Sequence, residues 1–184
     1  MFRSRLIATA ALAALVVAAC TSPSGSKPSA GPAAGSPAAA AGVAPHNATV
    51  PAQLQFAAKT VDGQDFSGQS LVGKPAVLWF WAPWCPVCQG EAPMVGQIAA
   101  AHPAVTFVGV AGLDQVPAMQ QFVASYPVRG FTNLADTDGA VWAKFGVTHQ
   151  PAFAFIRADG GIDVIKGGLS QPDLDHRVTV LAQP

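Results

Sequence analysis

The sequence predicts an α/β domain in which a central mixed sheet is covered by helices. Two apolar runs, residues 76–82 and 105–111, are nearly continuous, as expected of strands buried on both faces of a partly parallel sheet. Segments with helical periodicity follow both runs, and two further strand-like segments lie near the C-terminus. The order of the predicted elements, β, α, β, α, α, β, β, α, is typical of an α/β fold.

A β-hairpin is predicted ahead of this sheet. Residues 54–66 alternate in hydrophobicity around Asp62 and Gly63, a pair that favours a tight turn between antiparallel strands. The first apolar run is followed by a helix that we expect to begin at Pro86 and to end near residue 101. The first buried strand should therefore lead directly into a helix.

A helical insertion is predicted after the second apolar run. Apolar residues recur there with the 3-4-3 spacing of one helix face, at Val116, Met119, Val123 and Tyr126. Asp114 precedes this stripe and is a candidate N-cap. A shorter stripe over residues 141–145 predicts another helix, which Gly146 closes.

The C-terminal part is predicted to form a second hairpin and a last helix. Residues 152–156 and 162–166 are strand-like and are joined by the turn-forming residues 159–161. The last helix should start at Ser170, with Asp173 three residues further on as its capping partner. Its core-facing residues are expected to be Leu174, Val178 and Leu181.

Cys85 and Cys88 form a Cys-x-x-Cys pair at the predicted strand-to-helix junction, which is typical of a redox site. Cys85 should occupy the helix N-cap, with Pro86 at the first helical position, where its missing N–H leaves no donor unpaired. Free backbone N–H groups and the helix dipole would then favour a thiolate at Cys85. We expect Cys85 to be the attacked or attacking sulfur and the more buried Cys88 to be the resolving thiol.

Glu91 is the only glutamate of the chain and lies three residues after Cys88 on the same helix face. A partly buried carboxylate there would accept or supply the Cys88 proton as a general acid or base. The alternative is a surface glutamate that stabilises the first turns of the helix. The sequence alone leaves both interpretations open.

The third cysteine, Cys20, ends a segment with the features of a secretory signal peptide. Arg3 and Arg5 precede an apolar stretch over residues 6–19 that is too short to span a bilayer. Residues 17–20, Val-Ala-Ala-Cys, resemble a bacterial lipobox, which predicts cleavage before Cys20 and lipid attachment to its sulfur. An ordinary signal peptide that ends nearby is the alternative, and both interpretations place the protein outside the cytoplasm.

Changes in composition divide the chain into three regions. Residues 1–19 are predicted to be a lipoprotein-type signal peptide, residues 20–48 a flexible tether rich in Ala, Pro, Gly and Ser, and residues 49–184 one folded domain. A tether of about 28 such residues would span roughly 30 Å as a coil. The remaining ~135 residues have the usual size of a single domain.

Charge balance and cysteine usage exclude several classes of function. The chain has ten basic and ten acidic residues, and loss of Arg3 and Arg5 with the signal peptide leaves it slightly acidic, which argues against nucleic-acid binding. A structural zinc site normally takes four ligands, whereas one Cys-x-x-Cys is present and the four histidines are scattered. We therefore predict no metal and no cofactor, with weak copper binding by the cysteines and a histidine as the remaining alternative.

The redox motif, the helix that follows it and the closing β-β-α unit resemble the thioredoxin fold. Trp84 precedes the first cysteine, and Pro93 matches the proline that kinks the thioredoxin helix. Gln150 and Pro151 precede the second hairpin, where the family carries its cis-proline. The resemblance implies that this proline loop and the motif residues Trp84, Pro86 and Val87 contact the substrate.

Further features are similar to the extracytoplasmic TlpA/DsbE branch of this fold. They are the N-terminal hairpin, the insertion over residues 114–126 and the pattern Cys-x-x-Cys-x-x-Glu-x-Pro. Residues 75–85 and 108–119 look like the corresponding segments of the DsbF and DsbE proteins of actinobacteria, and the lipobox favours the DsbF type. Thioredoxin itself has a buried aspartate where this chain has Trp79, so the proton handling should differ and Glu91 is a candidate substitute.

The resemblance implies an oxidase that introduces disulfides into exported proteins through an exchangeable Cys85–Cys88 bond. Its expected partners are reduced or unfolded exported proteins with cysteines, a membrane partner that resets the disulfide, and the membrane itself through the lipid on Cys20. A reductase of the TlpA/DsbE type that serves cytochrome c maturation is one alternative. A surface-tethered binding module with a redox-inert disulfide is another, and a secreted form is the alternative to a membrane-anchored one.

Overall fold

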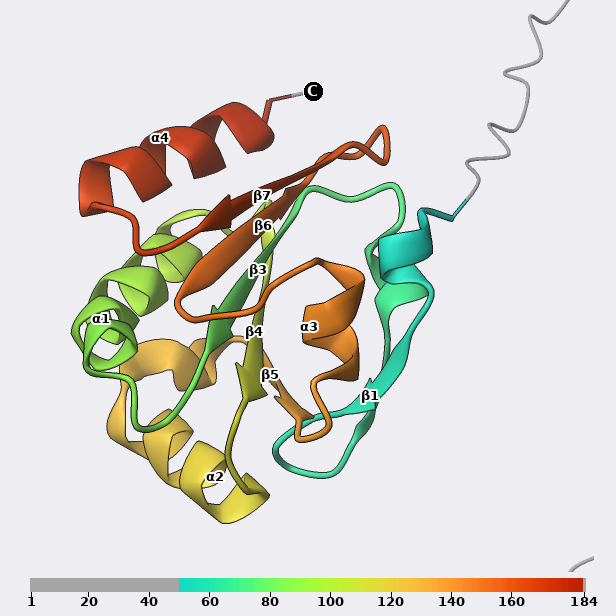
Figure 1. Ribbon diagram of the computed structural model, residues 1–184. Helices are drawn as coiled ribbons and strands as arrows, with labels where there is room; N and C mark the ends of the chain where they lie inside the picture. Colours follow the sequence, from blue (N-terminus) through green and yellow to red (C-terminus); the bar gives the residue numbers. More distant parts are fainter. Residues whose placement is uncertain (1–49, 184) are drawn as a thin grey trace, which may run out of the picture. The chain divides into compact units, whose positions relative to one another are not determined.

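A five-stranded mixed sheet with the order β5-β4-β3-β6-β7 forms the centre of the fold (Figure 1). The parallel strands are β3 (Ala76–Trp81), β4 (Thr106–Gly112) and β5 (Thr132–Asp136). The strands β6 (Ala152–Ile156) and β7 (Ile162–Lys166) form an antiparallel hairpin, and β6 pairs antiparallel with β3. The predicted α/β class with a central mixed sheet is confirmed.

The structure, a computed structural model, describes residues 50–183 of the chain. The predicted signal peptide (residues 1–19), the tether (residues 20–48) and the lipidation site Cys20 lie outside the described residues. None of the helices within residues 50–183 is long and apolar enough to cross a membrane.

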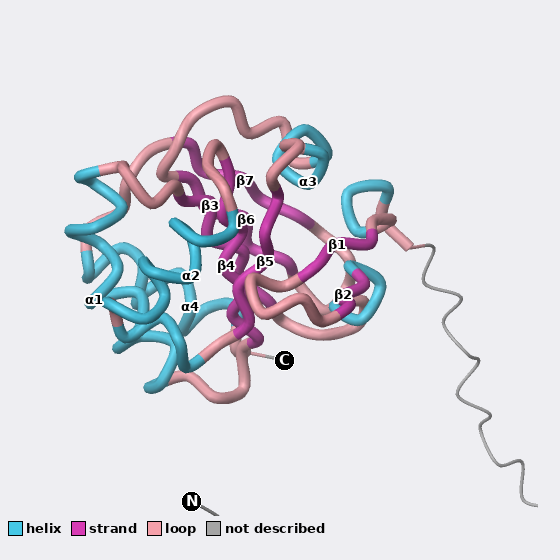
Figure 2. The backbone as a smooth tube through the Cα atoms, turned by 90° about the horizontal axis from the view of Figure 1, so that it is seen from below, coloured by secondary structure: helices cyan, strands magenta, loops and turns pink. Residues whose placement is uncertain are grey.

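Helices cover both faces of the sheet, as seen from the front in Figure 1 and from below in Figure 2. One face carries α1 (Pro86–Ala101), α2 (Val116–Ser125) and α4 (Gln171–Leu181). The opposite face carries α3 (Ala140–Lys144) and the N-terminal segments. Three short 3-10 helices complete the described part: η1 (Ala52–Leu54), η2 (Gly68–Leu71) and η3 (Pro127–Gly130).

Strand β3 lies between two hydrophobic cores, and all six of its residues are buried. Because side chains alternate across a strand, Val77, Trp79 and Trp81 pack under α1, α2 and α4, whereas Leu78 and Phe80 pack toward α3. This two-sided burial explains the continuous apolar run that predicted the strand.

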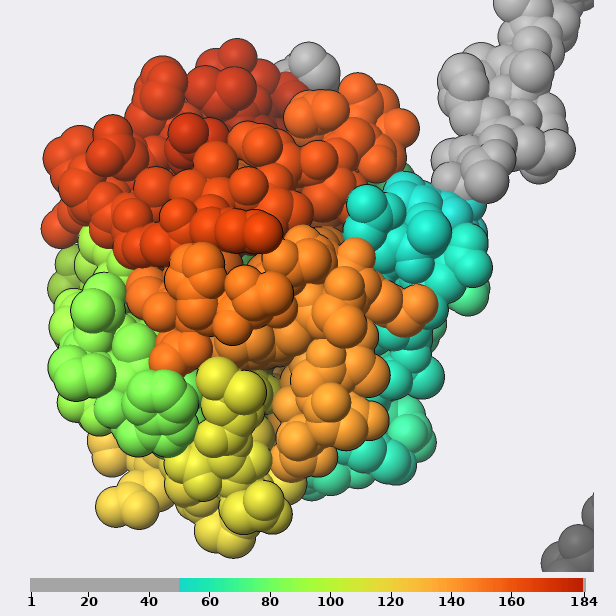
Figure 3. All heavy atoms as spheres, in the orientation of Figure 1, coloured from blue at the N-terminus to red at the C-terminus, as the bar shows by residue number. Residues whose placement is uncertain are grey.

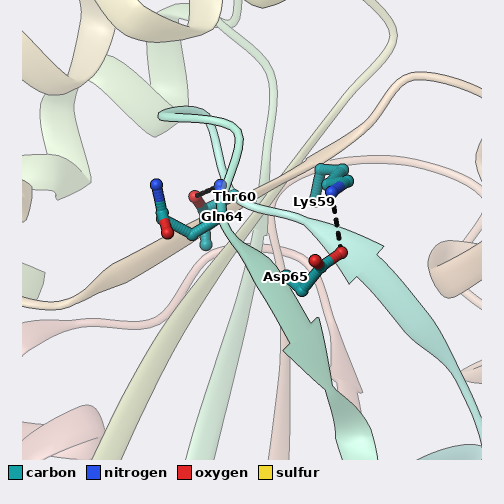
Figure 4. Close-up of polar contacts among 4 residues, drawn as sticks. All are labelled: Lys59, Thr60, Gln64 and Asp65. Atoms are coloured by element: carbon teal, nitrogen blue, oxygen red, sulfur yellow. Dashed lines mark hydrogen bonds and ion pairs between the residues drawn. The ribbon is translucent and has the colours of Figure 1, made fainter.

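The predicted N-terminal hairpin consists of β1 (Ala57–Lys59) and β2 (Asp65–Ser67), which pair antiparallel. Gly63 has φ +81° in the turn, a conformation that favours glycine. Figure 4 shows the two side-chain contacts that join its arms: the Gln64 N–H donates to Thr60 Oγ1 at 3.0 Å, and Lys59 Nζ lies 2.7 Å from Asp65 Oδ1.

The structure corrects the sequence-based element order at β5, which was not predicted. Its sequence, Thr-Asn-Leu-Ala-Asp, is short and contains residues that are depleted in strands. Two of its three polar side chains make hydrogen bonds within the nearby chain. The Asn133 amide donates to the carbonyls of Val128 and Phe131, and the Asp136 carboxylate accepts the Val141 and Trp142 N–H groups in α3. Residues 132–136 therefore form a strand because they pair with β4, not because of their own strand propensity.

The helix boundaries agree with the prediction to within about one residue: α3 is Ala140–Lys144 rather than 141–145, α2 ends at Ser125, and the cap of α2 differs. Gln115 is the N-cap there, and Asp114 instead accepts a hydrogen bond from the Gln115 N–H through Oδ1, at 2.7 Å. The prediction of Asp114 as the cap was therefore wrong by one residue. Ser170 caps α4 as predicted, because its Oγ accepts the Asp173 N–H at 3.3 Å and donates to Asp173 Oδ2 at 2.6 Å.

Candidate redox site

The end of β3 and the start of α1 position Cys85. It is the N-cap of α1, with an extended backbone (φ −78°, ψ 114°), and Pro86 follows within the first turn. The Cys88 N–H donates to Cys85 Sγ at 3.2 Å. Cys85 Sγ therefore faces the first free N–H groups of the helix, at its positive end.

Cys88 lies one turn into α1 and is completely buried, whereas Cys85 retains 4% of its exposure. The Cys88 thiol donates to Cys85 Sγ, and the two sulfur atoms are 2.6 Å apart, close enough for oxidation to join them in a disulfide. Burial is the main cause that raises the pKa of the Cys88 thiol far above its usual value, and the hydrogen bond with Cys85 adds to this. Cys88 therefore needs a proton acceptor to react as a thiolate and takes up a proton when it leaves as one.

Glu91 supplies a carboxyl group beside this thiol. Its side chain is only 7% exposed, so the alternative interpretation of Glu91 as a surface residue is wrong. Burial raises the pKa of the Glu91 carboxyl, and two hydrogen bonds partly oppose that shift. The Leu169 N–H donates to Oε1 at 2.9 Å, and the Trp79 indole N–H donates to Oε2 at 3.3 Å.

The loop between β7 and α4 packs over this carboxyl. A Cβ atom on Gly168 would lie 2.5 Å from Glu91 Oε1, so any larger residue would displace the carboxyl or the loop. Trp79 is a core residue of β3, and neither Gly168 nor Leu169 was among the residues predicted for the site. Alternation along β3 places Trp79 on the face that α1 covers, which is the one sequence feature that points to its contact with Glu91.

Replacing Trp79 with Phe is expected to raise the pKa of Glu91 further, because the lost indole N–H stabilises the carboxylate. Trp81→Phe is the matched control, since Trp81 is equally buried on the same strand and its Nε1 has no hydrogen-bond partner among the described residues. Glu91 is the only glutamate, so ¹³C-glutamate labelling gives one carboxyl resonance to titrate by NMR. Equal titration of both variants would contradict the assigned contact.

The other predicted site residues surround the cysteine pair at the same end of the sheet. Trp84, Pro86 and Val87 are exposed, with 53% of Trp84 and 55% of Val87 accessible. The Gln150–Pro151 bond is cis, as the resemblance implies, and Pro151 is buried. Pro151 precedes β6, whose Ala152 is in register with Phe80 near the end of β3.

His149 is exposed and contacts the Thr148 hydroxyl through Nδ1 at 3.3 Å. Within residues 50–183, no three His, Cys, Asp or Glu side chains converge as ligands for a metal ion.

Comparison with known proteins shows the same fold around the same kind of site. The profile of the AhpC/TSA family matches residues 49–165. The soluble secreted antigen MPT53 of Mycobacterium tuberculosis strain H37Rv is 51% identical over 140 residues, which are 74% of this chain and 80% of that protein. The thiol-disulfide oxidoreductase ResA of Oceanobacillus iheyensis is 27% identical over 135 residues, 71% of this chain and 69% of ResA.

Solved structures agree with these relatives. The structure of M. tuberculosis (MTB) DsbF, in mixed oxidised and reduced forms, has 73% sequence identity and a TM-score of 0.72 over 72% of this chain and 99% of that one. A secreted M. tuberculosis disulfide oxidoreductase, homologous to E. coli DsbE, has 54% identity and a TM-score of 0.68 over 70% of this chain and 98% of that one.

A thioredoxin fold that holds two adjacent cysteines at a helix N-terminus defines a thiol-disulfide oxidoreductase, and the comparisons agree with this class. The chain belongs to the AhpC/TSA family and is a homologue of the secreted-type DsbF and DsbE oxidoreductases. The predicted thioredoxin-like class is confirmed, and a redox-inert binding module is not supported.

Proposed function

We propose that the protein oxidises cysteine pairs in exported proteins by exchanging its Cys85–Cys88 disulfide. A substrate thiolate attacks Cys85 Sγ, the Cys85–Cys88 bond breaks, and Cys88 leaves as a thiolate that takes up a proton. The second substrate thiolate then attacks the substrate sulfur of the mixed disulfide and releases Cys85. The substrate loses two electrons, and the protein becomes the dithiol.

The observation that carries the oxidising direction is the hydrogen bond from the Cys88 N–H to Cys85 Sγ at the start of α1. It stabilises negative charge on Cys85, which exists only in the reduced form. Stabilising the dithiol makes the disulfide a stronger oxidant. Pro86 lacks an N–H of its own, and the N–H groups that follow it in the first helical turn have no carbonyl partner earlier in the helix, so they can face the sulfur.

Two sets of side chains complete the proposed reaction. Glu91 acts as the acid and base for Cys88, which is supported by its burial and by its place on the same helix. Trp84, Pro86 and Val87 contact the substrate from the motif, and Gln150 and Pro151 contact it from the loop before β6. The exposure of Trp84, Pro86 and Val87 beside a nearly buried sulfur supports the motif contacts, and the resemblance to thioredoxins supports the contacts of Gln150 and Pro151.

We further propose that the protein works outside the cytoplasm, anchored to the cell membrane by lipid on Cys20. The basic flank, the short apolar stretch and the lipobox-like residues 17–20 support this location, and M. tuberculosis relatives are described as secreted. A membrane redox partner then accepts two electrons from the Cys85–Cys88 dithiol and restores the disulfide. A secreted form without a lipid is the alternative.

The reduction potential tests the proposed direction. A soluble form that begins at Val43, equilibrated in glutathione buffers, is expected to have a potential near the roughly −120 mV of the oxidant DsbA. A value near the roughly −270 mV of thioredoxin would instead support the reductase alternative. Alkylation of free thiols followed by mass measurement reports the oxidised fraction directly.

A further inference from the structure

Leu113 has a backbone conformation that is unusual for its residue type. It follows β4 and has φ +60°, in the left-handed region, and it is the only residue other than glycine with a positive φ within residues 50–183. A branched aliphatic side chain rarely adopts this conformation, because its Cβ approaches the following backbone. Glycine or asparagine would fit the turn with less strain.

Neither packing nor the turn accounts for a leucine at this position. The side chain of Leu113 is 54% exposed and belongs to neither hydrophobic core. The backbone carbonyl of Leu113 accepts a hydrogen bond from the Trp84 indole N–H at 3.1 Å. That hydrogen bond needs no particular side chain at position 113, so the exposed leucine side chain has no evident structural role.

Trp84, Val87 and Leu113 are exposed apolar residues near the cysteine pair, and we refer to them as the apolar surface. They are three of the four large, exposed hydrophobic residues in the described part of the chain, and the fourth, Val180, lies on α4. Trp84 and Val87 lie on either side of Cys85 in the sequence. The hydrogen bond from the Trp84 indole N–H to the Leu113 carbonyl places Leu113 beside Trp84. In Figure 3, the green segment at the start of α1 borders the yellow segment at the start of α2.

We propose that Leu113 is a specificity-determining residue, which selects substrate segments with an apolar side chain next to the reacting cysteine. This inference rests on the proposed function and names its substrate class: unfolded, extended polypeptide. Folded proteins bury most of their cysteines and aliphatic side chains, so an exposed cysteine with an apolar neighbour marks a chain that has not folded. The apolar side chain next to the substrate cysteine packs on the apolar surface while the substrate thiolate attacks Cys85 Sγ.

The test uses two reduced peptides of equal length and charge, each with one cysteine, flanked by leucine in one peptide and by serine in the other. Exchange with the oxidised protein is expected to be roughly fivefold faster for the leucine peptide, because part of the apolar area leaves water. Leu113→Gly and Leu113→Asn, which both suit a positive φ, should reduce that preference below about twofold. Leu113→Met should keep it, and Val180→Asn is the matched surface control.

Two control measurements separate this inference from the proposed function. The rate with dithiothreitol and the reduction potential should be the same in the unaltered protein and in Leu113→Gly, because the hydrogen bonds at Cys85 and at Glu91 do not involve the Leu113 side chain. If the unaltered protein does not exchange with dithiothreitol, the proposed function fails and this inference fails with it. If exchange is normal but Leu113→Gly retains the full preference for the leucine peptide, only the role of Leu113 is overturned.

Discussion

Replacing Cys88 with Ala is expected to leave substrates that have a single cysteine covalently attached to Cys85. In the intact protein, the buried Cys88 lies 2.6 Å from Cys85 and can expel a bound thiol by attacking the mixed disulfide. Alanine removes that attack, so turnover of dithiol substrates through the Cys85–Cys88 bond should stop. Of all substitutions considered, this one should have the largest effect on activity.

The adduct can be measured with a peptide that has a single cysteine, since no second thiol can then release it. The Cys88→Ala protein is first converted to the mixed disulfide of Cys85 with thionitrobenzoate. The reduced peptide should displace one equivalent of thionitrobenzoate and add its own mass, and dithiothreitol should remove it. Cys85→Ala is the matched control and should form no adduct, because Cys88 is completely buried. An adduct on Cys85→Ala but not on Cys88→Ala would reverse the assigned roles.

Replacing Glu91 with Gln should slow exchange by about tenfold or more if Glu91 carries the Cys88 proton. The thiol of Cys88 has a raised pKa because it is buried, so it depends on a nearby acceptor to become a nucleophile. Burial also raises the pKa of Glu91, which makes it a better acceptor than an exposed carboxylate. The intact protein should therefore show a rate inflection at the raised Glu91 pKa that Glu91→Gln lacks.

Stopped-flow rates from pH 5 to pH 9 would test this expectation. Asp136→Asn is the matched control, because Asp136 is also a buried carboxyl with a pKa raised by burial, but it accepts the Val141 and Trp142 N–H groups of α3 on the other face of the sheet. That variant should lose stability without losing the rate inflection. Unchanged rates in Glu91→Gln across the whole range would leave Glu91 with a structural role only.

The same substitution has an expected signature in stability. Because the folded-state pKa of Glu91 is raised, folding favours its protonated form. The stability that this provides is complete below the unfolded-state pKa and is lost as the pH rises through the folded-state value. The free energy of unfolding of the intact protein should therefore fall across this window relative to that of Glu91→Gln, which urea titrations at several pH values can measure.

Short-range features of the sequence predicted much of the fold. The continuous apolar run of β3, the cysteine spacing at the start of α1 and the capping pair Ser170 and Asp173 all express local geometry, and the structure contains each of them. The redox pair was predictable for the same reason, because helix N-caps and Cys-x-x-Cys spacing depend on a few consecutive residues.

Features that depend on distant contacts were not predictable in this way. Strand β5 has a sequence that does not favour a strand, and it forms because β4 offers it a pairing edge. The backbone strain of Leu113 is likewise invisible in the sequence.

The sequence by itself determined the class of the protein, the position of its cysteine pair and the carboxyl group one helical turn beyond it. Only the tertiary structure decided that Glu91 is buried, because its environment is built by Trp79 from β3 and Leu169 from the loop before α4, 12 and 78 residues away along the chain. Burial and hydrogen bonding set a carboxyl's pKa, and both depend on which distant segments pack around it. The identity of a reactive group is thus a local property, whereas its reactivity is a property of the folded domain.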